Sequence, residues 1–230
     1  MEQTSASSPL TGAVQSLASD VVSVLRDGGH GAALGDAAVA GAGGELALAA
    51  VRVLGADCLL PAVLVGGPPD AGDLAVFDKA RRAYPPAADA ATTSHWSHWA
   101  MTHVLVRLEG LPPQDAAEPE TAWLEGASWQ ALTRQLAGLA ALAVPGVDSA
   151  VARKAQERPV DVARGFVRAV RRRDWLQAAG AGRWLAVLAD VPETLGLDAG
   201  LDFVMHMGGA DARVALHVHA AQLIRGEARA

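Results

Sequence analysis

The sequence predicts an all-α fold, an irregular bundle of about eight to nine helices that contains an antiparallel helical hairpin in its C-terminal part. Hydrophobic residues make up 51% of the 230 residues, and many of them are alanine, which has the highest helix propensity. Aromatic residues are only 4%, and the residues that sheets prefer are mostly confined to short runs. Apolar residues recur instead at the spacing of amphipathic helices.

In the first half of the chain this spacing predicts four helices, and it does not decide the secondary structure of one further segment. The first helix is expected to end before Gly28-Gly29, and the segment Thr92-Thr93-Ser94 is expected to cap the last one. The run from Leu59 to Val65 fits either a buried helical turn or a strand. Helices are predicted over residues 10–26, 45–54, 74–84 and 94–109.

In the second half, two neighbouring helices give the clearest local pattern. Residues 160–172 and 175–188 each carry an apolar stripe at positions i, i+3, i+4 and i+7. A short turn around Arg173-Asp174 brings the two helices together antiparallel, as in a helical hairpin. All helices of this half are predicted over residues 121–143, 149–156, 159–172, 174–189, 192–207 and 211–225.

The chain is expected to form one helical domain over residues 10–230, with the loop 111–120 as a sub-boundary and residues 1–9 as a disordered tail. This tail lacks the basic and apolar segments of a signal peptide. No stretch approaches the roughly 18 uninterrupted apolar residues of a membrane span. We therefore expect a cytoplasmic protein with no membrane partner.

Charge and cysteine content argue against several classes of protein, namely nucleic-acid binders, disulfide-bonded proteins and multi-cysteine zinc proteins. The net charge is −6 and the sequence pI is about 5.6, whereas a general nucleic-acid binder needs a phosphate-neutralising surface. Cys58 is the single cysteine, so there is no intramolecular disulfide and no multi-cysteine zinc site. Nearly all basic residues are arginine, a bias that indicates a GC-rich genome such as an actinobacterial one.

The segment from His95 to His103 concentrates three of the seven histidines and two of the six tryptophans. At 100° per residue, a helix places Trp96, Trp99 and His103 on one face, with His95 beside that face and His98 pointing elsewhere. Tryptophan suits a half-wet pocket wall, and histidine titrates near neutrality. We predict a ligand wall at Trp96 and Trp99, and an acid–base role for His103 assisted by His95.

The second histidine group is His206, His217 and His219. A strand would place His217 and His219 on one face, next to His206, as a metal or acid–base site. A helix would separate them by about 200° and leave His217 alone facing the interior. The continuation Ala-Ala-Gln-Leu-Ile-Arg favours the helix.

Other motifs are sparse. The chain has no paired Glu-x-x-His of a di-iron bundle and no Gly-x-Ser-x-Gly nucleophile elbow. No metal site is predicted, and the sequence identifies neither a cofactor nor an oligomeric state. The carboxylates available to a histidine site are Glu45, Asp57, Glu109, Glu125 and Asp211.

A basic stripe runs along the predicted helix 159–172, formed by Arg164, Arg168, Arg171 and Arg172. A solvated helix face is the ordinary explanation. The functional hypothesis is a binding site for an acidic partner or a phosphorylated ligand, because arginine makes bidentate contacts with anions. We predict Arg168 and Arg172 as binding residues.

Two classes of function remain open. In the first, the protein is a helical binding or regulatory module that holds a small apolar molecule or an acidic protein partner at Trp96, Trp99, His217, Arg168 and Arg172. In the second, it is a small enzyme, cofactor-independent or metal-assisted, in which His103 and His95 transfer protons on an apolar substrate. The sequence slightly favours the binding module, because catalysis requires a convergence of side chains that sequence alone does not show.

Overall fold

A computed structural model describes residues 8–28, 34, 41–110 and 117–227, and within these residues it confirms an all-α bundle with no strand. The predicted tail and sub-boundary lie mostly outside the described residues. Of the tail, Ser8 and Pro9 are described, and they cap and begin the first helix. The predicted loop 111–120 is described only from Ala117 onward.

The N-terminal half follows the predicted order. The first helix, α1, has the Ser8 hydroxyl accepting a hydrogen bond from the Thr11 amide, which satisfies one free N–H of its first turn. The elements of this half are α1 (Pro9–Arg26), α2 (Gly41–Leu54), the 3-10 turn η2 (Gly55–Leu59), α3 (Leu60–Leu64), α4 (Ala71–Ala83) and α5 (Thr92–Leu108).

The C-terminal half contains the longer-range packing. Its caps follow sequence rules: Ser128, Ser149 and Asp174 accept backbone hydrogen bonds at the starts of α6, α7 and α9. The elements are η3 (Ala122–Leu124), α6 (Trp129–Gly138), η4 (Ala140–Leu142), α7 (Ala150–Gln156), α8 (Pro159–Arg171), α9 (Trp175–Val187), η5 (Glu193–Leu195), α10 (Leu197–Gly208) and α11 (Ala212–Glu227).

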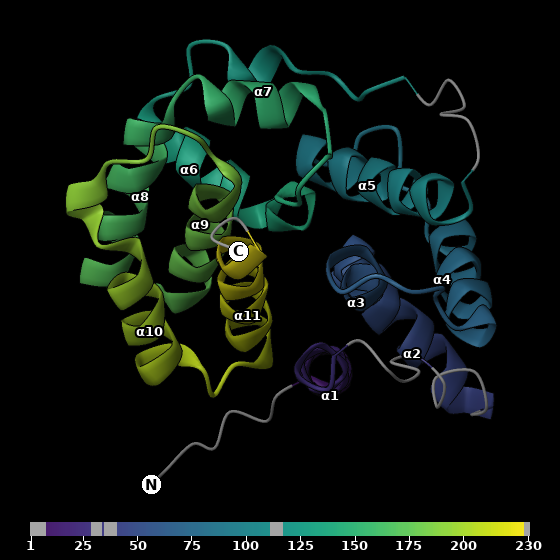
Figure 1. Cartoon of the computed structure of the whole chain (residues 1–230). Coiled ribbons are helices and arrows are strands. Elements are labelled where there is room, and N and C mark those ends of the chain that lie inside the picture. The colour runs from purple at the N-terminus through teal and green to yellow at the C-terminus, as the bar shows by residue number, and fades with distance from the viewer. Residues whose placement is uncertain (1–7, 29–33, 35–40, 111–116, 228–230) are drawn as a thin grey trace, which may run out of the picture.

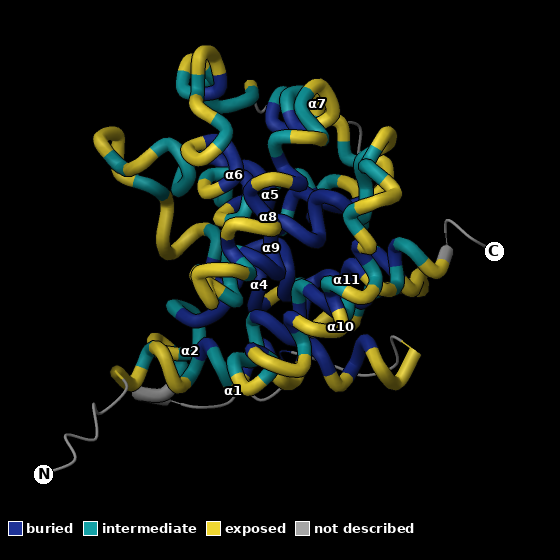
Figure 2. Tube along the Cα trace, turned by 90° about the vertical axis from the view of Figure 1, so that its left-hand side faces the viewer, coloured by how far each residue is buried: buried dark blue, intermediate teal, exposed yellow. Residues whose placement is uncertain are grey.

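The two halves form two groups of helices that lie side by side. In Figure 1, α2 to α5 form one group, α6 and α8 to α11 form the other, and α1 lies between them at one end. Helix α1 contacts both α2 and α11, and η2 contacts η4. Buried residues run through both groups and meet where they join (Figure 2).

Helix α9 is the centre of the C-terminal group. It packs against α6, α8, α10 and α11, and all eight residues from Ala178 to Leu185 are buried. Small side chains permit these close approaches, and the Trp184 indole is buried with its Nε1 donating to the carbonyl oxygen of Leu136 at 2.6 Å. Three residues, Arg172 to Asp174, connect α8 to α9, which fits the expected antiparallel pair.

Two local predictions need correction, and one segment that the sequence left open has a definite structure. The open run from Leu59 to Val65 is helical, because η2 continues directly into α3. The single helix predicted over 121–143 is instead η3, α6 and η4, since the chain becomes helical again only after the Ser128 cap. Helix α5 starts earlier than predicted, so Ala91 occupies the cap position and Thr92 to Ser94 lie inside the first turn.

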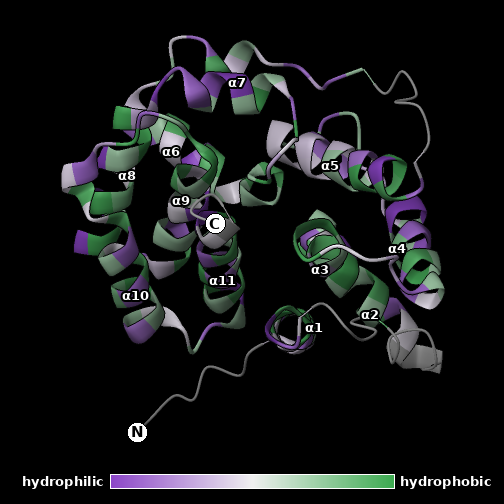
Figure 3. Ribbon diagram, viewed as in Figure 1, coloured by the Kyte–Doolittle hydropathy of each residue, from purple (hydrophilic) through white to green (hydrophobic). Residues whose placement is uncertain are grey.

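Within the described residues, one apolar stretch is long enough to span a membrane. Residues Gly44–Leu64, which include most of α2, all of η2 and α3, have a mean hydropathy of 1.8 in an 18-residue window. However, 61% of that window is buried inside the bundle, and Figure 3 shows hydrophobic residues along α2 and α3 where they meet other helices. Length and burial together are typical of a core helix.

Gly180 allows α9 to approach α6, and its substitution gives a first prediction. A Cβ atom at Gly180 would lie 2.6 Å from the carbonyl oxygen of Ala137, a backbone atom that cannot rotate away. We expect Gly180→Ala to lower the free energy of unfolding by about 1–3 kcal/mol, measured by urea denaturation. Gly12→Ala on α1 is the control, since a Cβ there meets nothing; it should stabilise by up to about 1 kcal/mol. Equal effects of the two substitutions would contradict the close approach.

Candidate functional site

Three polar side chains from distant parts of the chain meet where the two helix groups join. We call Asp57, Arg183 and His217, from η2, α9 and α11, the buried cluster. Nη1 of Arg183 donates to Oδ1 of Asp57 at 2.6 Å, and its Nε donates to the Ala143 carbonyl at 3.1 Å. Nδ1 of His217 lies 3.4 Å from Arg183 Nη1 and 3.7 Å from Asp57 Oδ2.

The cluster is buried to an unusual depth. The side chains of Arg183 and Asp57 are 0% and 3% exposed, and that of His217 is 13% exposed. Moving an ion pair out of water is unfavourable unless the partners are well placed and further hydrogen bonds satisfy them. Here Nη2 of Arg183 is buried without a hydrogen-bond partner among the described residues. A buried ion pair of this kind is therefore weak evidence for added stability.

Burial fixes the charge state of the histidine. It lowers the pKa of His217 to about 4; the Asp57 charge opposes this shift, and the Arg183 charge adds to it. The imidazole is consequently neutral near neutral pH. Because a guanidinium only donates, Nδ1 of His217 accepts from Arg183, and the network assigns the imidazole proton to Nε2.

The buried cluster borders a cavity of about 430 Å³, which we call the central cavity. Asp57 and His217 line it, together with mostly apolar residues from both helix groups, such as Val14, Leu54 and Leu142. This volume suits a small organic ligand. Eleven of the 18 lining residues are aliphatic or glycine and seven are polar or charged, so the lining suits a molecule with both an apolar and a polar part. The remaining polar lining residues are Ser97, Arg134, Asp174, Gln177 and Arg213.

The cavity's two lining arginines differ in how they are engaged. Arg213 is paired with Asp211, at 2.8 Å between Nη2 and Oδ2. The pKa of Asp211 falls to about 2, because the hydrogen bonds from Arg213 and Gln15 outweigh the opposing effect of its burial. Arg134, on the exposed face of α6, makes no ion pair with a described carboxylate. It is the lining cation that is free to meet an anionic group.

The predicted tryptophan wall lies in the core. Trp96 is 0% exposed and its Nε1 donates to the Glu120 carbonyl, while Trp99 is 9% exposed and stacks on His103 with the ring centres 4.7 Å apart. His103 borders a void of about 20 Å³, room for about one water molecule. Burial and the Arg107 charge lower the pKa of His103. The predicted shared face is present, but the cavity beside it is too small for an organic ligand.

The other two histidines of α5 are not among the residues that line the central cavity. His95 and His98 are half-buried. Nδ1 of His98 is buried without a partner among described residues. Burial, followed by the charges of Arg52 and Arg81, lowers the pKa of His98. Neither side chain lines a cavity described here, so a role of His95 beside His103 stays a prediction.

The C-terminal histidines are separated, as the helical alternative predicts. Helix α11 places His217 inward, and His219 lies near Arg26 of α1, with Arg26 Nε donating to its Nε2 at 3.0 Å. His206 is exposed on α10. His103 and His217 border different cavities that share the wall residues Ala100, Ala141 and Leu142. Among the described residues, no three histidine, cysteine, aspartate or glutamate side chains converge as metal ligands.

The predicted binding residues Arg168 and Arg172 lie in a second hollow. This groove, with a volume of about 860 Å³, runs along α8 and is also lined by Arg164, Arg171 and Trp129. We call it the arginine groove. It lies on a different face of α8 from the buried residues that meet α9, such as Phe166.

The sequence identified part of the buried cluster. His217 was predicted as a binding residue, and Asp57 was among the carboxylates available to a histidine. Arg183 was missed, although a single charged residue between Gly182 and Trp184, in an otherwise apolar helix, is the kind of signal that marks a buried charge.

The fold and the site together define an all-α protein in which a buried Asp–Arg–His cluster borders a ligand-sized cavity between two groups of helices. No family model, curated protein or solved structure matches the chain.

Proposed function

We propose that this protein is a binding module that holds a small, mainly apolar molecule in the central cavity, with the molecule's polar group at His217. The observation that carries this proposal is the position of the buried cluster at the wall of a cavity of about 430 Å³.

The chemistry of the lining supports one orientation of the ligand. The residues of α1, α5 and η4 that line the cavity are apolar apart from Ser97, and they suit the ligand's hydrocarbon part. With Nδ1 engaged by Arg183, the Nε2–H of the neutral His217 remains as a donor for a carbonyl or hydroxyl oxygen. Arg134, exposed on α6, is suited to a carboxylate at the entrance.

Catalysis at the same cavity is the second candidate, and it requires the other tautomer of His217. With the proton on Nδ1, which lies 3.7 Å from Asp57 Oδ2, the Nε2 atom is free to accept a proton, and the Asp57 carboxylate would stabilise the cation that forms. The proton acceptor would be His217, rather than His103 and His95 as the sequence predicts. A ligand whose C–H hydrogens exchange in deuterium oxide with the wild-type protein but not with His217→Gln would support this candidate; equal exchange would contradict it.

Filling the central cavity should abolish ligand binding. Gly138 lines the cavity, and a Cβ there meets no other atom, so Gly138→Phe introduces a ring at the cavity without disturbing the core. We expect small apolar fragments that carry one polar group to bind the wild-type protein and to bind this variant at least about tenfold more weakly. Fluorine NMR of a fragment library measures the binding.

Gly12→Phe is the matched control, because Gly12 is also an exposed helical glycine with open space around its Cβ, but it lies outside the cavity lining. It should leave binding unchanged. Fragments that bind the Gly138→Phe variant as well as the wild type, or a library from which nothing binds, would contradict the proposed function.

A further inference from the structure

The arginine groove combines positive charge with exposed apolar surface. Four guanidinium groups line it, those of Arg164, Arg168, Arg171 and Arg172, and no carboxylate is among its lining residues. Val160 and Val167 also line it and are 48% and 43% exposed, high values for valine on a helix that packs against a core. Hydrophobic and hydrophilic residues alternate along α8 in Figure 3.

Three of these arginines have no anionic partner among the described residues. Arg168, Arg171 and Arg172 make no ion pair with a described carboxylate, while Arg164 reaches Asp161 at 3.3 Å. Like charges three and four residues apart on a helix repel each other by a few tenths of a kcal/mol per pair. A bound anionic group would remove that repulsion.

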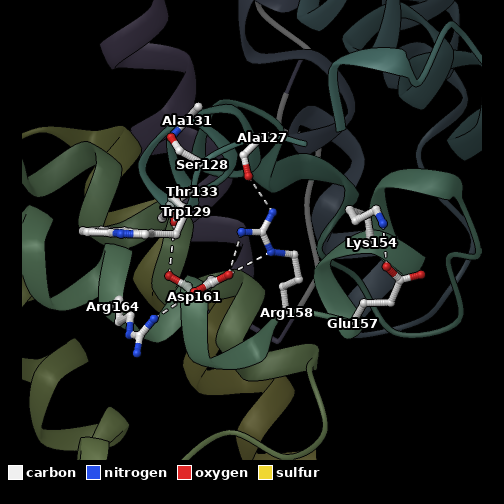
Figure 4. A network of polar contacts seen from close by, with 10 residues as sticks. All are labelled: Ala127, Ser128, Trp129, Ala131, Thr133, Lys154, Glu157, Arg158, Asp161 and Arg164. Atoms are coloured by element: carbon white, nitrogen blue, oxygen red, sulfur yellow. Dashed lines mark hydrogen bonds and ion pairs between the residues drawn. The ribbon is translucent and has the colours of Figure 1, made fainter. Parts of the chain in front are cut away.

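The groove has fixed walls. Asp161 pairs with both Arg158 and Arg164, and the Thr133 hydroxyl donates to the carbonyl oxygens of Trp129 and Asp161 at 2.7 and 3.3 Å. Figure 4 shows these groups together at the start of α8, with Trp129 beside them. The Arg168 guanidinium lies 5.6 Å from the centre of the Trp129 ring, a cation–π contact that holds one arginine in place.

The dimensions and chemistry of the groove favour a helical peptide over other anions. Val160 and Val167 are separated by about two helical turns, or roughly 10 Å along α8, so an inorganic anion cannot contact both. The guanidinium of arginine can donate two parallel hydrogen bonds to a carboxylate, and the exposed valines can pack against the apolar residues of an amphipathic helix. The net charge of −6 disfavours nucleic acid and anionic membranes as partners.

We propose that the arginine groove binds an acidic amphipathic helix of a protein partner. The partner's apolar residues pack on Val160, Val167 and the Trp129 ring, and its carboxylates pair with Arg168, Arg171 and Arg172. The arginine groove and the central cavity have no lining residue in common, so substitutions in the groove leave the lining of the cavity unchanged.

The test selects peptides without assuming their sequence. A displayed library of random peptides of about 15 residues, long enough to match the roughly 20 Å of α8, is selected on the folded wild-type chain. We expect enriched peptides to carry several Asp or Glu residues and apolar residues at i, i+3 or i+4, and i+7. Their affinities are then measured by fluorescence anisotropy.

Matched variants locate the binding. Arg168→Glu/Arg172→Glu should weaken the selected peptides at least about tenfold. Arg26→Glu/Lys79→Glu, with the same charge change at exposed sites on α1 and α4, should not. Val160→Ser/Val167→Ser, which leaves every charge in place, should weaken binding severalfold. Circular dichroism confirms that each variant is folded.

Several results would overturn the proposal. These are enrichment of peptides that are not acidic, unchanged affinity in Arg168→Glu/Arg172→Glu, and full affinity in Val160→Ser/Val167→Ser, which would indicate simple charge attraction. Failure of the library to yield any binding peptide would also overturn it. If phosphatidylglycerol vesicles bind the wild-type chain through these arginines and peptides do not, the groove is a lipid site and the proposal is wrong.

Discussion

Asp57→Asn is expected to lower the free energy of unfolding by about 3–5 kcal/mol, since it leaves the guanidinium of Arg183 buried without a counter-charge. Both side chains are almost completely inaccessible, at 3% and 0% exposure, so water cannot compensate for the lost partner. Arg183→Met should produce a loss in the same range, because it leaves the Asp57 carboxylate uncompensated. Urea denaturation followed by circular dichroism measures both.

The double variant tests whether the loss comes from the unpaired charge. Asp57→Asn/Arg183→Met contains no buried charge at this position, so its loss should be smaller than the sum of the single losses by at least about 1 kcal/mol. Lys154→Met is the control, since it removes one partner of the exposed pair Lys154–Glu157 and should change stability by no more than about 0.5 kcal/mol. Additive single losses would show that the two residues do not interact as the structure indicates.

Acid should destabilise the wild-type protein through His217. The pKa of this imidazole is about 4 in the folded state, because burial disfavours the cation, against an ordinary value of 6.5 in the unfolded chain. Between these values the unfolded state binds more protons, so stability is fully present above about pH 6.5 and falls as the pH decreases towards 4. The complete loss from this group is about 3 kcal/mol, of which about 2 kcal/mol falls between pH 7 and pH 5.

His217→Gln should remove this part of the pH dependence. The loss of unfolding free energy between about pH 7 and pH 5 should be smaller by about 2 kcal/mol in this variant than in the wild type. His98, His103 and His219, whose pKa values burial also lowers, retain their own contributions in both proteins. His206→Gln, at an exposed site on α10, is the control and should behave as the wild type. An unchanged slope in His217→Gln would mean that this imidazole is accessible to protons in the folded state.

Four charged groups around His217 raise or lower the pKa that the pH experiment tests. Asp57 from η2 favours the cation, while Arg183 from α9 and Arg213 from α11 oppose it, and Asp211 favours it. Burial outweighs the two carboxylates, which explains why the pKa falls although a carboxylate lies 3.7 Å from Nδ1.

Local sequence patterns predicted the helices well and their ends less well. Periodic apolar segments such as residues 9–26 and 159–171 are helical, because their apolar stripes agree with a proline in the first helical turn. The segment 121–143 broke into shorter pieces, because a cap at Ser128 and turns around Leu139 override an apolar run that propensity alone would continue.

In the candidate sites, too, sequence patterns predicted some features correctly and others not. The arginines of α8 share a groove because helical spacing alone places residues 164, 168, 171 and 172 near one another. The apolar stripe of the same helix includes Val167, which is 43% exposed and lines the groove. The tryptophan and histidine face of α5 was also predicted, but the size of the cavity beside it depends on what packs there.

By itself, the sequence determined the fold class and the positive face of α8 and favoured the separation of His217 from His219, because each follows from contacts within one helix or from composition. Only the tertiary structure decided that Asp57 and Arg183, 126 residues apart, pair beside His217 at a cavity. No local rule relates residues so distant in the chain. Their meeting depends on how η2, α9 and α11 pack, and that packing is set by the shapes of the many buried side chains around them.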